Sequence, residues 1–591
     1  MTKDAGLKNV EKMSNGNQGE HIQVQVIHNY LLSAAREMMR NLKRTAFDTI
    51  IYEIQDFGLG IYDRECRLLA ESPGLAIFTR GNDFALRKMV EFLGEENIHE
   101  GDVILFNYPY WSSNHTLDVL VTSPIFYGDE LVGYTACKAH WLDLNQQDPG
   151  YCLDTTSIHN EGLILPALKI YKRGVRDQEV ENLIMYNTRI PDRVVGNMNA
   201  QISCCHTGEK RVQELVEKFG LDAFKTASQE ILNHGERIAR SRLASLPKGT
   251  WSAEDWVDDD GVEKDKMIKI KVTVTVTDDE FIVDFTGTDP AVKGPVNLPI
   301  GITEGVSALA FKGLTTPDTP ANDGNFRPLR VIAPEGSLVN AQHPAATFTI
   351  WPSIHIPEII CKALAPAMPD IVPACSGGEV VSVMGVGTHP VTGKVWLEAT
   401  NEAVGFGGHA GGDGENAIMH LSEPGCRNNP IEVLENKAPL LIEGYFLRQD
   451  SCGAGENRGG VGATRVYRFT APGSAVTILK KTKTRPWALN DGLEAEANHI
   501  ILRPGTDREV LTGAVNEPLE SGEVLISSAG GGGGWGNPLH RSPEKVLQDV
   551  RDGYVSLDSA KRDYGVIIDT GSWTIDYSAT STLRQKRLGD K

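Results

Sequence analysis

The chain has 591 residues, of which 40% are hydrophobic and 23% charged, a composition typical of globular proteins long enough for more than one domain. Its formal net charge of −20 and pI near 5.3 oppose binding to nucleic acid or anionic membranes, because both favour a basic surface. No run approaches the roughly 18 apolar residues of a membrane span, and the first twenty residues lack the apolar stretch of a signal peptide, so we expect a cytoplasmic protein.

The cysteines agree with a reducing compartment. Nine of them are scattered along the chain, and none shows the C-x-x-C spacing of a zinc or redox motif. Cys204 and Cys205 are adjacent, which suits neither a simple disulfide nor a tetrahedral zinc site.

The N-terminal elements are predicted from polarity and periodicity. Residues 1–20 are polar and are expected to form a flexible tail. Apolar residues spaced three and four apart then predict a core-facing helix over Ile22–Arg44. Strand patterns follow at Phe57–Tyr62, Leu68–Ala70 and Asp102–Asn107, with a helix predicted over Asp83–Leu93.

A β-hairpin is the clearest local geometry. Val119–Phe126 and Leu131–Ala139 are strand-like, and a turn at Gly128-Asp129 separates them. Counting outward from that turn places Asp118 opposite Ala139 and beside His140. The hairpin is therefore expected to bring Asp118 and His140 together at its open end, with His115 one short loop away.

The remainder divides into a helical stretch, a β-rich middle and a glycine-rich region. Helical patterns cover Glu209–Lys218 and Ala223–Leu243, and Ile268–Val276 with Phe281–Phe285 resembles a half-buried hairpin. We expect a mixed α+β fold, in which a metal-bearing N-terminal α/β region is followed by a β-rich, glycine-rich region. The predicted boundaries are residues 21–246, 247–345, 346–540 and a C-terminal helical segment over 541–591.

Asp56, His115, Asp118 and His140 are the candidate metal ligands. Imidazole nitrogens and carboxylate oxygens converging from different elements suit Zn, Mn or Fe and leave a position for water or substrate. His-x-x-Asp alone is a weak pattern, and these residues are equally consistent with unrelated polar positions at loop ends. Asp143, three residues after His140, is either a carboxylate that orients an imidazole or a turn residue.

Several other motifs are interpreted as structural. Lys480-Lys481-Thr482-Lys483 is expected to be a solvated loop, and Asp258-Asp259-Asp260-Gly261 a β-turn, because it lacks the first ligand and the final glutamate of a calcium loop. The run Gly530–Gly534 is expected to serve turns and close packing, with approach to a ligand or partner as the alternative. No Walker A motif or dinucleotide fingerprint is present.

Taken in order, a set of motifs from about residue 22 to 567 resembles the hydantoinase B/5-oxoprolinase family. It includes Asp56-Phe57, Ile61-Tyr62-Asp63, His115-Thr116-Leu117-Asp118-Val119, Lys138-Ala139-His140, Asp284-Phe285-Thr286-Gly287-Thr288, Asn325-Phe326-Arg327-Pro328 and Arg458-Gly459-Gly460-Val461-Gly462. This family contains ATP-dependent hydantoinases, 5-oxoprolinases and caprolactamase, and acetone and acetophenone carboxylases are related to it.

The resemblance implies a divided enzyme. An actin-like A-type subunit would bind ATP, and this chain would be the B-type subunit carrying a divalent metal at Asp56, His115, Asp118 and His140. His115, Asp118 and His140 would also be the catalytic residues. The family's His-His-x-Asp-x-Gly-Gly and Gly-Asp elements are replaced here by His140-Trp141-Leu142-Asp143-Leu144-Asn145-Gln146 and Gly196-Asn197, which puts the substrate in doubt. Trp141 is a candidate for the wall of the substrate pocket.

Three functions are compatible with the sequence. The leading hypothesis is ATP-dependent opening of a cyclic amide of the hydantoin, oxoproline or lactam type, in which the partner phosphorylates the substrate and this chain delivers hydroxide from its metal. The first alternative is a subunit of an ATP-dependent ketone carboxylase that uses the same metal. The second is a non-catalytic scaffold subunit without metal.

Overall fold

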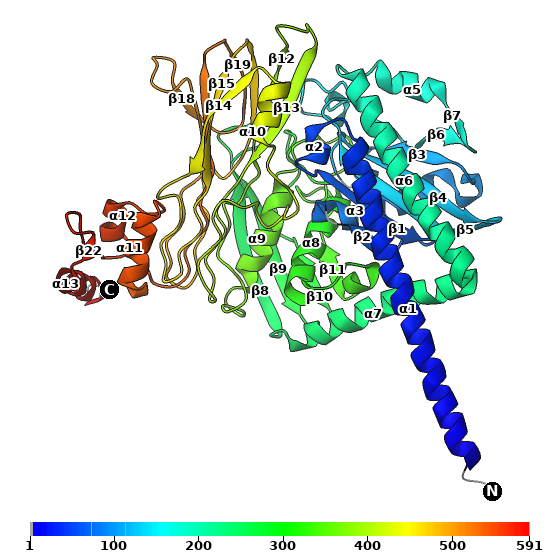
Figure 1. Cartoon of the computed structure of the whole chain (residues 1–591). Helices are drawn as coiled ribbons and strands as arrows, with labels where there is room; N and C mark the ends of the chain where they lie inside the picture. The colour runs from blue at the N-terminus through cyan, green and yellow to red at the C-terminus, as the bar shows by residue number, and fades with distance from the viewer. Residues whose placement is uncertain (1–3, 73, 113, 590–591) are drawn as a thin grey trace.

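Helices and sheets alternate throughout the computed structural model, which describes residues 4–72, 74–112 and 114–589 and confirms the predicted mixed α+β fold (Figure 1). The long helix α1 (Asp4–Thr45) includes the whole predicted helix but begins much earlier. From Asp4 onward this helix covers residues for which the sequence predicted a flexible tail; residues 1–3 lie outside the described residues.

A seven-stranded antiparallel sheet forms the N-terminal part. Its strand order is β2 (Leu68–Ser72), β1 (Phe57–Asp63), β5 (Glu130–His140), β4 (Asp118–Tyr127), β3 (Val103–Phe106), β6 (Leu168–Lys172) and β7 (Val175–Arg176). Helices α1 and α6 (Pro191–Phe219) pack against each other and against this sheet, and α7 (Leu221–Ser245) follows α6. Helix α3 (Ala76–Leu93) packs on β1 and begins earlier than the predicted Asp83.

The two faces of strand β5 serve different purposes, because successive side chains in a strand alternate. Thr135 donates a hydrogen bond to Cys205 O of α6 (3.1 Å). Lys138, on the other face, lies over the ring of Phe78 in α3. His140 shares the face of Lys138, so the candidate site lies on the side of the sheet away from α6.

A second sheet follows α7 and has the order β11 (Leu329–Ile332), β10 (Phe281–Asp284), β9 (Ile268–Val276) and β8 (Gly249–Val257). Alternate residues of β9 are buried, which confirms the predicted half-buried hairpin of β9 with β10. Helix α9 (Pro352–Leu364) packs on β8 and β9, and α8 (Ile300–Thr315) lies between α9 and α3. Helices α9, α8 and α3 thus connect the second sheet to the first.

Two further sheets contain most strands of the glycine-rich region. One has the order β13 (Val395–Glu402), β12 (Val381–Thr388), β16 (Gly473–Ile478) and β19 (Val515–Leu519). The other has the order β14 (Leu440–Leu447), β15 (Ala463–Phe469), β20 (Val524–Ser528), β17 (His499–Leu502) and β18 (Val510–Thr512). Short helices elsewhere are α2 (Thr49–Tyr52), α4 (Pro109–Ser112), α5 (Gln178–Met185), α10 (Ile431–Lys437), η1 (Glu95–Asn97), η2 (Ile158–Asn160), η3 (Asp323–Phe326) and η4 (Pro538–His540).

The glycine run at 530–534 joins extended backbone segments that come from distant parts of the chain. Gly532 donates to Gly460 O (2.9 Å) and Gly533 to Cys375 O (2.8 Å). A Cβ on Gly532 would stand 1.9 Å from Phe406 O, which only glycine avoids. Backbone packs on backbone here, so the interpretation as close packing is correct.

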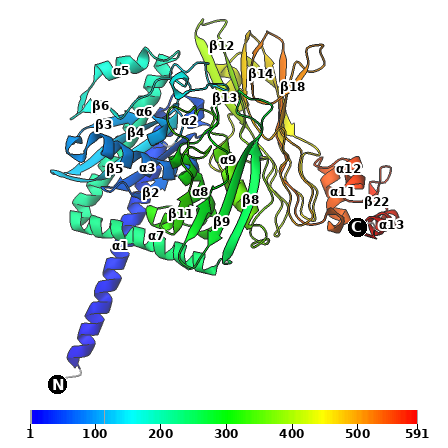
Figure 2. The same cartoon turned by 180° about the vertical axis from the view of Figure 1, so that it is seen from behind.

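The C-terminal segment lies at the far end of the molecule from the N-terminal end of α1 (Figures 1 and 2). It consists of α11 (Pro543–Arg551), α12 (Leu557–Arg562), a small hairpin of β21 (Ile568–Asp569) and β22 (Thr574–Ile575), and α13 (Tyr577–Gly589). Helices α11, α12 and α13 agree with the helical segment expected over residues 541–591. The proposed domain boundaries stay predictions.

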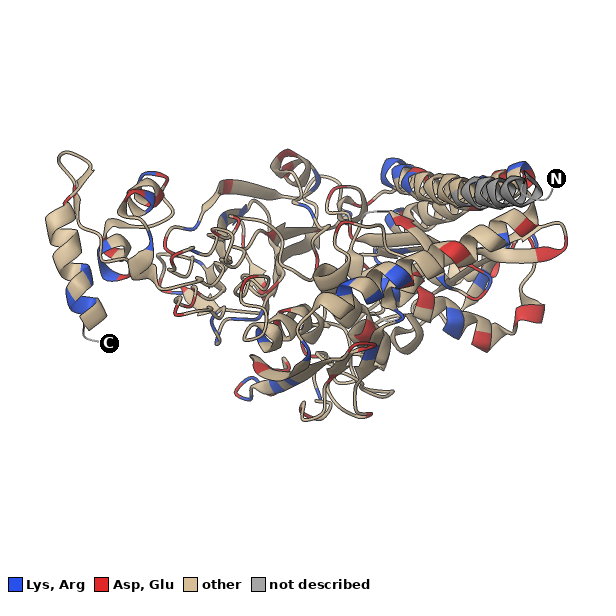
Figure 3. Cartoon of the chain, turned by 90° about the horizontal axis from the view of Figure 1, so that it is seen from below, with Lys and Arg blue, Asp and Glu red and all other residues tan. Residues whose placement is uncertain are grey.

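One apolar core includes residues from the N-terminal region, the middle region and part of the glycine-rich region, from Ile27 to Trp487. In the described part of the chain, no helix combines the length and apolarity needed to cross a membrane. In the view of Figure 3, acidic and basic residues are interspersed along the helices and strands.

Candidate metal centre

The β4–β5 hairpin brings Asp118 and His140 together. Tyr127 pairs with Glu130 and Phe126 with Leu131 beside the turn, as counted from the sequence. A β-bulge between Ile125 and Phe126 then shifts the register by one residue. Asp118 consequently pairs with His140 itself, whereas the sequence prediction placed it opposite Ala139.

Two short connections bring the other candidates to the same end of the hairpin. The turn before β4 is closed by Asp118 N donating to His115 O (3.1 Å), which places the His115 ring beside Asp118. Strand β1 pairs with β5, and His140 N donates to Asp56 O (3.1 Å), so Asp56 lies at the start of β1 next to His140.

His115, Asp118 and His140 form a compact buried cluster. One potential ligand atom from each lies within 4.8 Å of the others. His140 Nδ1 is 3.1 Å from Asp118 Oδ1, and His115 Nε2 is 3.1 Å from Asp118 Oδ2. Asp56 is not part of this close cluster, although its side chain lines the same cavity. The sequence prediction thus converges on one site, with three members close together and the fourth beside them.

Burial and mutual charge set the protonation of the cluster. Burial lowers the pKa of His115 to about 4, so its imidazole is neutral at neutral pH. Burial would also lower the pKa of His140, but the hydrogen bond to Asp118 and the charge of Asp56 outweigh it and raise that pKa. Burial raises the pKa of Asp56 well above its ordinary value.

Unpaired polar atoms indicate that the cluster fits a metal ion. Asp56 Oδ1, His115 Nδ1, Asp118 Oδ2 and His140 Nε2 are buried without a hydrogen-bond partner. Buried polar groups without partners are costly, and a divalent cation would satisfy nitrogen and carboxylate oxygen atoms of this kind. The donor set of two imidazoles and one or two carboxylates fits Zn, Mn or Fe.

The cluster opens on a cavity of about 80 Å³ whose walls come from distant parts of the chain. Its other side is formed by residues of α9, β12 and the loops around Glu379 and Glu423. Phe348 stands against the ring of His115, with ring centroids 5.4 Å apart, and against Tyr151. The site is therefore completed by segments more than 200 residues downstream of its candidate ligands.

Glu161 holds one of those segments in place, a role that was not recognised in the sequence. Its carboxylate accepts hydrogen bonds from Thr347 N (2.9 and 3.0 Å), Phe348 N (3.1 Å) and Thr155 Oγ1 (3.0 Å). These contacts fix Phe348 beside His115. No sequence motif around Glu161 signals this function, because Thr347 and Phe348 are almost 190 residues away.

Among the residues that surround the ligands, Trp141 is not where it was expected, and Asp143 and Asn197 have structural partners of their own. Trp141 is fully buried and donates through Nε1 to Gln201 Oε1 of α6 (2.7 Å), on the face away from the cavity, so it does not line the pocket. Asp143 pairs with Arg189 and orients no imidazole. Asn197 donates to Asp48 and accepts from Phe47 N, which fixes the start of α2.

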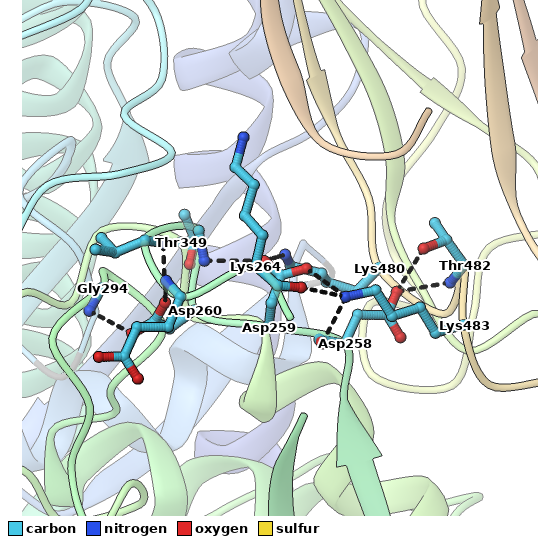
Figure 4. A network of polar contacts seen from close by, with 12 residues as sticks. Asp258, Asp259, Asp260, Lys264, Gly294, Thr349, Lys480, Thr482 and Lys483 are labelled. Atoms are coloured by element: carbon cyan, nitrogen blue, oxygen red, sulfur yellow. Dashed lines mark hydrogen bonds and ion pairs between the residues drawn. The ribbon is translucent and has the colours of Figure 1, made fainter. Parts of the chain in front are cut away.

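The two motifs expected to be a solvated loop and a β-turn bind each other (Figure 4). Lys480 Nζ donates to Asp259 Oδ1 (2.6 Å), and Thr482 donates to Asp258 Oδ2 (2.7 Å). Lys480 and Lys481 are only 3% and 2% exposed, so the solvated-loop prediction is wrong for them. Lys480 Nζ also lies 4.5 Å from the ring centroid of Trp351, whose indole lines the metal cavity. This network connects the middle and glycine-rich regions directly behind the cavity wall.

Comparison with known proteins identifies relatives across almost the whole chain. Residues 20–538 match the family model described as hydantoinase B/oxoprolinase. The chain is 35% identical to the B-type component of the putative D-/L-hydantoinase from Pseudomonas sp. (strain NS671), over 95% of this chain and 98% of that protein.

Solved structures agree with this similarity. The crystal structure of ATP-dependent caprolactamase from Pseudomonas jessenii superimposes with a TM-score of 0.87 at 29% identity, and covers 95% of this chain and 99% of that one. The nucleotide-free structure of acetone carboxylase gives a TM-score of 0.88 at 19% identity, over 96% of this chain and 83% of that one, which is a similarity of fold.

Proposed function

Because the chain belongs to the hydantoinase B/oxoprolinase family, we propose that it is the metal-bearing B-type subunit of a cytoplasmic, heteromeric, ATP-dependent amidohydrolase that opens a cyclic amide. The observation that carries this proposal is the buried His115–Asp118–His140 cluster with its unpaired ligand atoms. The names of its relatives support the class: one is a hydantoinase component and another an ATP-dependent caprolactamase.

The four candidate residues would hold a divalent cation, with Asp56 as the additional ligand beside the cluster. Such a cation polarises a carbonyl group and lowers the pKa of water toward neutrality. Asp118 orients the imidazole of His140 through the contact of Oδ1 with Nδ1, and burial keeps His115 neutral and able to donate its nitrogen lone pair. Phe348 and Tyr151 pack beside the cluster and exclude bulk water from it.

The proposal includes a partner. Cyclic amides are poor electrophiles, and coupling their opening to ATP requires a phosphorylation step for which this chain shows no Walker A motif. We therefore assign ATP binding to an actin-like A-type subunit and the attack of hydroxide to this chain. Two relatives, from a hydantoinase and a caprolactamase, are themselves named as single subunits of larger enzymes, which supports a hetero-oligomer.

The decisive experiment is reconstitution of the chain with its A-type partner, ATP and isotopically labelled bicarbonate, assayed against lactams, hydantoins and ketones. A ring-opened product with ATP consumed and no label fixed is expected. Label recovered in an acid-stable product would instead assign the chain to a ketone carboxylase and refute the hydrolase.

Metal analysis of the purified chain tests the scaffold alternative. The proposal requires about one divalent ion per chain, in keeping with a single four-residue site. A chain without bound metal that nevertheless supports the partner's activity would identify a scaffold subunit.

A further inference from the structure

The cavity in front of the His115–Asp118–His140 cluster has a lining of polar and apolar side chains. The unpaired ligand atoms and Asn114 Oδ1 belong to this lining. Most of the remaining lining is aliphatic or aromatic and comes from several segments, including Ile50, Leu75, Phe78, Ile354, Met384 and Ile478. A ligand in this cavity would place its polar edge toward the cluster and its apolar part against these aliphatic and aromatic side chains.

Apart from the two cluster histidines, the Asp, Glu, Lys and Arg side chains of this lining are all acidic. Asp56, Asp118, Glu379 and Glu423 line the cavity, and no lysine or arginine is among its described lining residues.

The nearby buried lysines already have other partners. Lys480 pairs with Asp259 and Lys481 with Asp255, each at 2.6 Å, on the far side of the cavity wall. Lys138 donates to Ser112 O and is absent from the lining. A ligand carboxylate in the apolar part would consequently be buried without a counter-ion, which costs several kcal/mol.

We propose that this cavity selects neutral cyclic amides with an apolar ring and rejects rings that bear a free carboxylate. The inference rests on the proposed function and narrows it, since it favours lactams and alkyl-substituted hydantoins over 5-oxoproline. Two cluster carboxylates would offset the charge of a divalent cation held there, and Glu423 would remain to repel a ligand anion.

The test compares two ligands of nearly equal shape, 5-oxoproline and 5-oxoprolinamide, which differ in the charge of one substituent. Binding of each to the metal-loaded complex with its partner is measured by calorimetry without ATP. The neutral amide is expected to bind at least about tenfold more tightly than the acid, because an unpaired buried charge is costly. The same ratio is then measured for ATP-dependent ring opening.

A pair of variants tests whether the charge of a lining carboxylate causes this selectivity. Glu423→Gln removes one negative charge and should reduce the amide-to-acid ratio severalfold, whereas Glu432→Gln, at an exposed position of α10, should leave it unchanged.

Equal or tighter binding of 5-oxoproline, absence of binding by both ligands, or a ratio unaffected by Glu423→Gln would overturn the inference. Selective binding of the neutral ring without opening of any ring would refute the hydrolase function and leave the selectivity intact.

Discussion

At the scale of single residues, the candidate site depends on one carboxylate placed between two imidazoles. Asp118 contacts His140 through Oδ1 and His115 through Oδ2, each at 3.1 Å. His115 Nδ1, His140 Nε2 and Asp118 Oδ2 are buried and have no hydrogen-bond partner. Removal of one imidazole therefore removes a ligand and also leaves the Asp118 carboxylate without one of its two partners.

His140→Ala is expected to reduce bound metal to background and to lower ATP-dependent turnover at least about 100-fold, because the stabilisation that a metal gives to the transition state amounts to several kcal/mol. Metal content is measured by plasma mass spectrometry and turnover by product formation. His159→Ala, at an exposed position, is the control and should retain both. Full activity of His140→Ala would contradict the site assignment.

Glu161 is expected to make stability depend on pH. Burial raises its pKa from 4.5 to about 7, so the folded state binds more protons than the unfolded state between these values. Its contribution to stability is present below about pH 4.5 and is lost as the pH rises through about 7, a change of about 3 kcal/mol.

Urea unfolding across this pH range compares the wild type with Glu161→Gln, which cannot titrate. The wild type should lose more stability than the variant as the pH rises. Parallel profiles would show that Glu161 does not titrate in this range.

At the scale of elements, the β4–β5 hairpin sets the site through its register. Its turn and its open end are ten residue pairs apart, and the β-bulge between Ile125 and Phe126 decides that Asp118 faces His140. Changes at the turn that preserve the register should therefore affect stability without affecting the metal.

Gly128→Ala tests this separation. Gly128 has φ +60° in the turn, and an added Cβ would meet nothing within 4 Å, so the cost is purely conformational and amounts to about 1 kcal/mol. Chemical denaturation should show this loss, whereas metal content stays unchanged. Asp129→Ala, at the exposed neighbouring position, is the control and should cost less. Loss of metal in Gly128→Ala would indicate that the register had shifted.

At the scale of the whole molecule, buried ion pairs connect the middle region to the glycine-rich region behind the cavity. Lys481 Nζ lies 2.6 Å from Asp255 Oδ2 of β8, and both side chains are almost fully buried. Lys480 bonds to Asp259 and packs on Trp351 of the cavity wall. The cavity therefore depends on how these two regions are held together.

Lys481→Met is expected to destabilise the protein by about 3–5 kcal/mol, because it leaves the Asp255 carboxylate buried and unpaired. The double variant Lys481→Met with Asp255→Leu should recover most of this loss in urea unfolding, since it buries no lone charge. Losses that simply add in the double variant would show that the two side chains do not act as a pair.

The sequence by itself determined most local elements and predicted which candidate ligands would meet. Period-two and period-3.6 patterns located β9, β10, α6 and α7, and strand pairing around Gly128 was enough to predict that Asp118 and His140 meet. These features depend on interactions between residues close in the chain, which a local pattern records.

Only the tertiary structure decided which downstream residues complete the cavity wall. It also decided that some charged segments are buried. Phe348, Trp351, Glu379 and Glu423 reach the site through packing of α9, β12 and their loops, and no local pattern encodes such contacts. Lys480 and Lys481 are buried because Asp259 and Asp255, more than 220 residues away, compensate their charge. Whether a lysine can be buried depends on where its acidic partner lies in the fold. The sequence does not record that position, so it predicted a solvated loop for these two lysines.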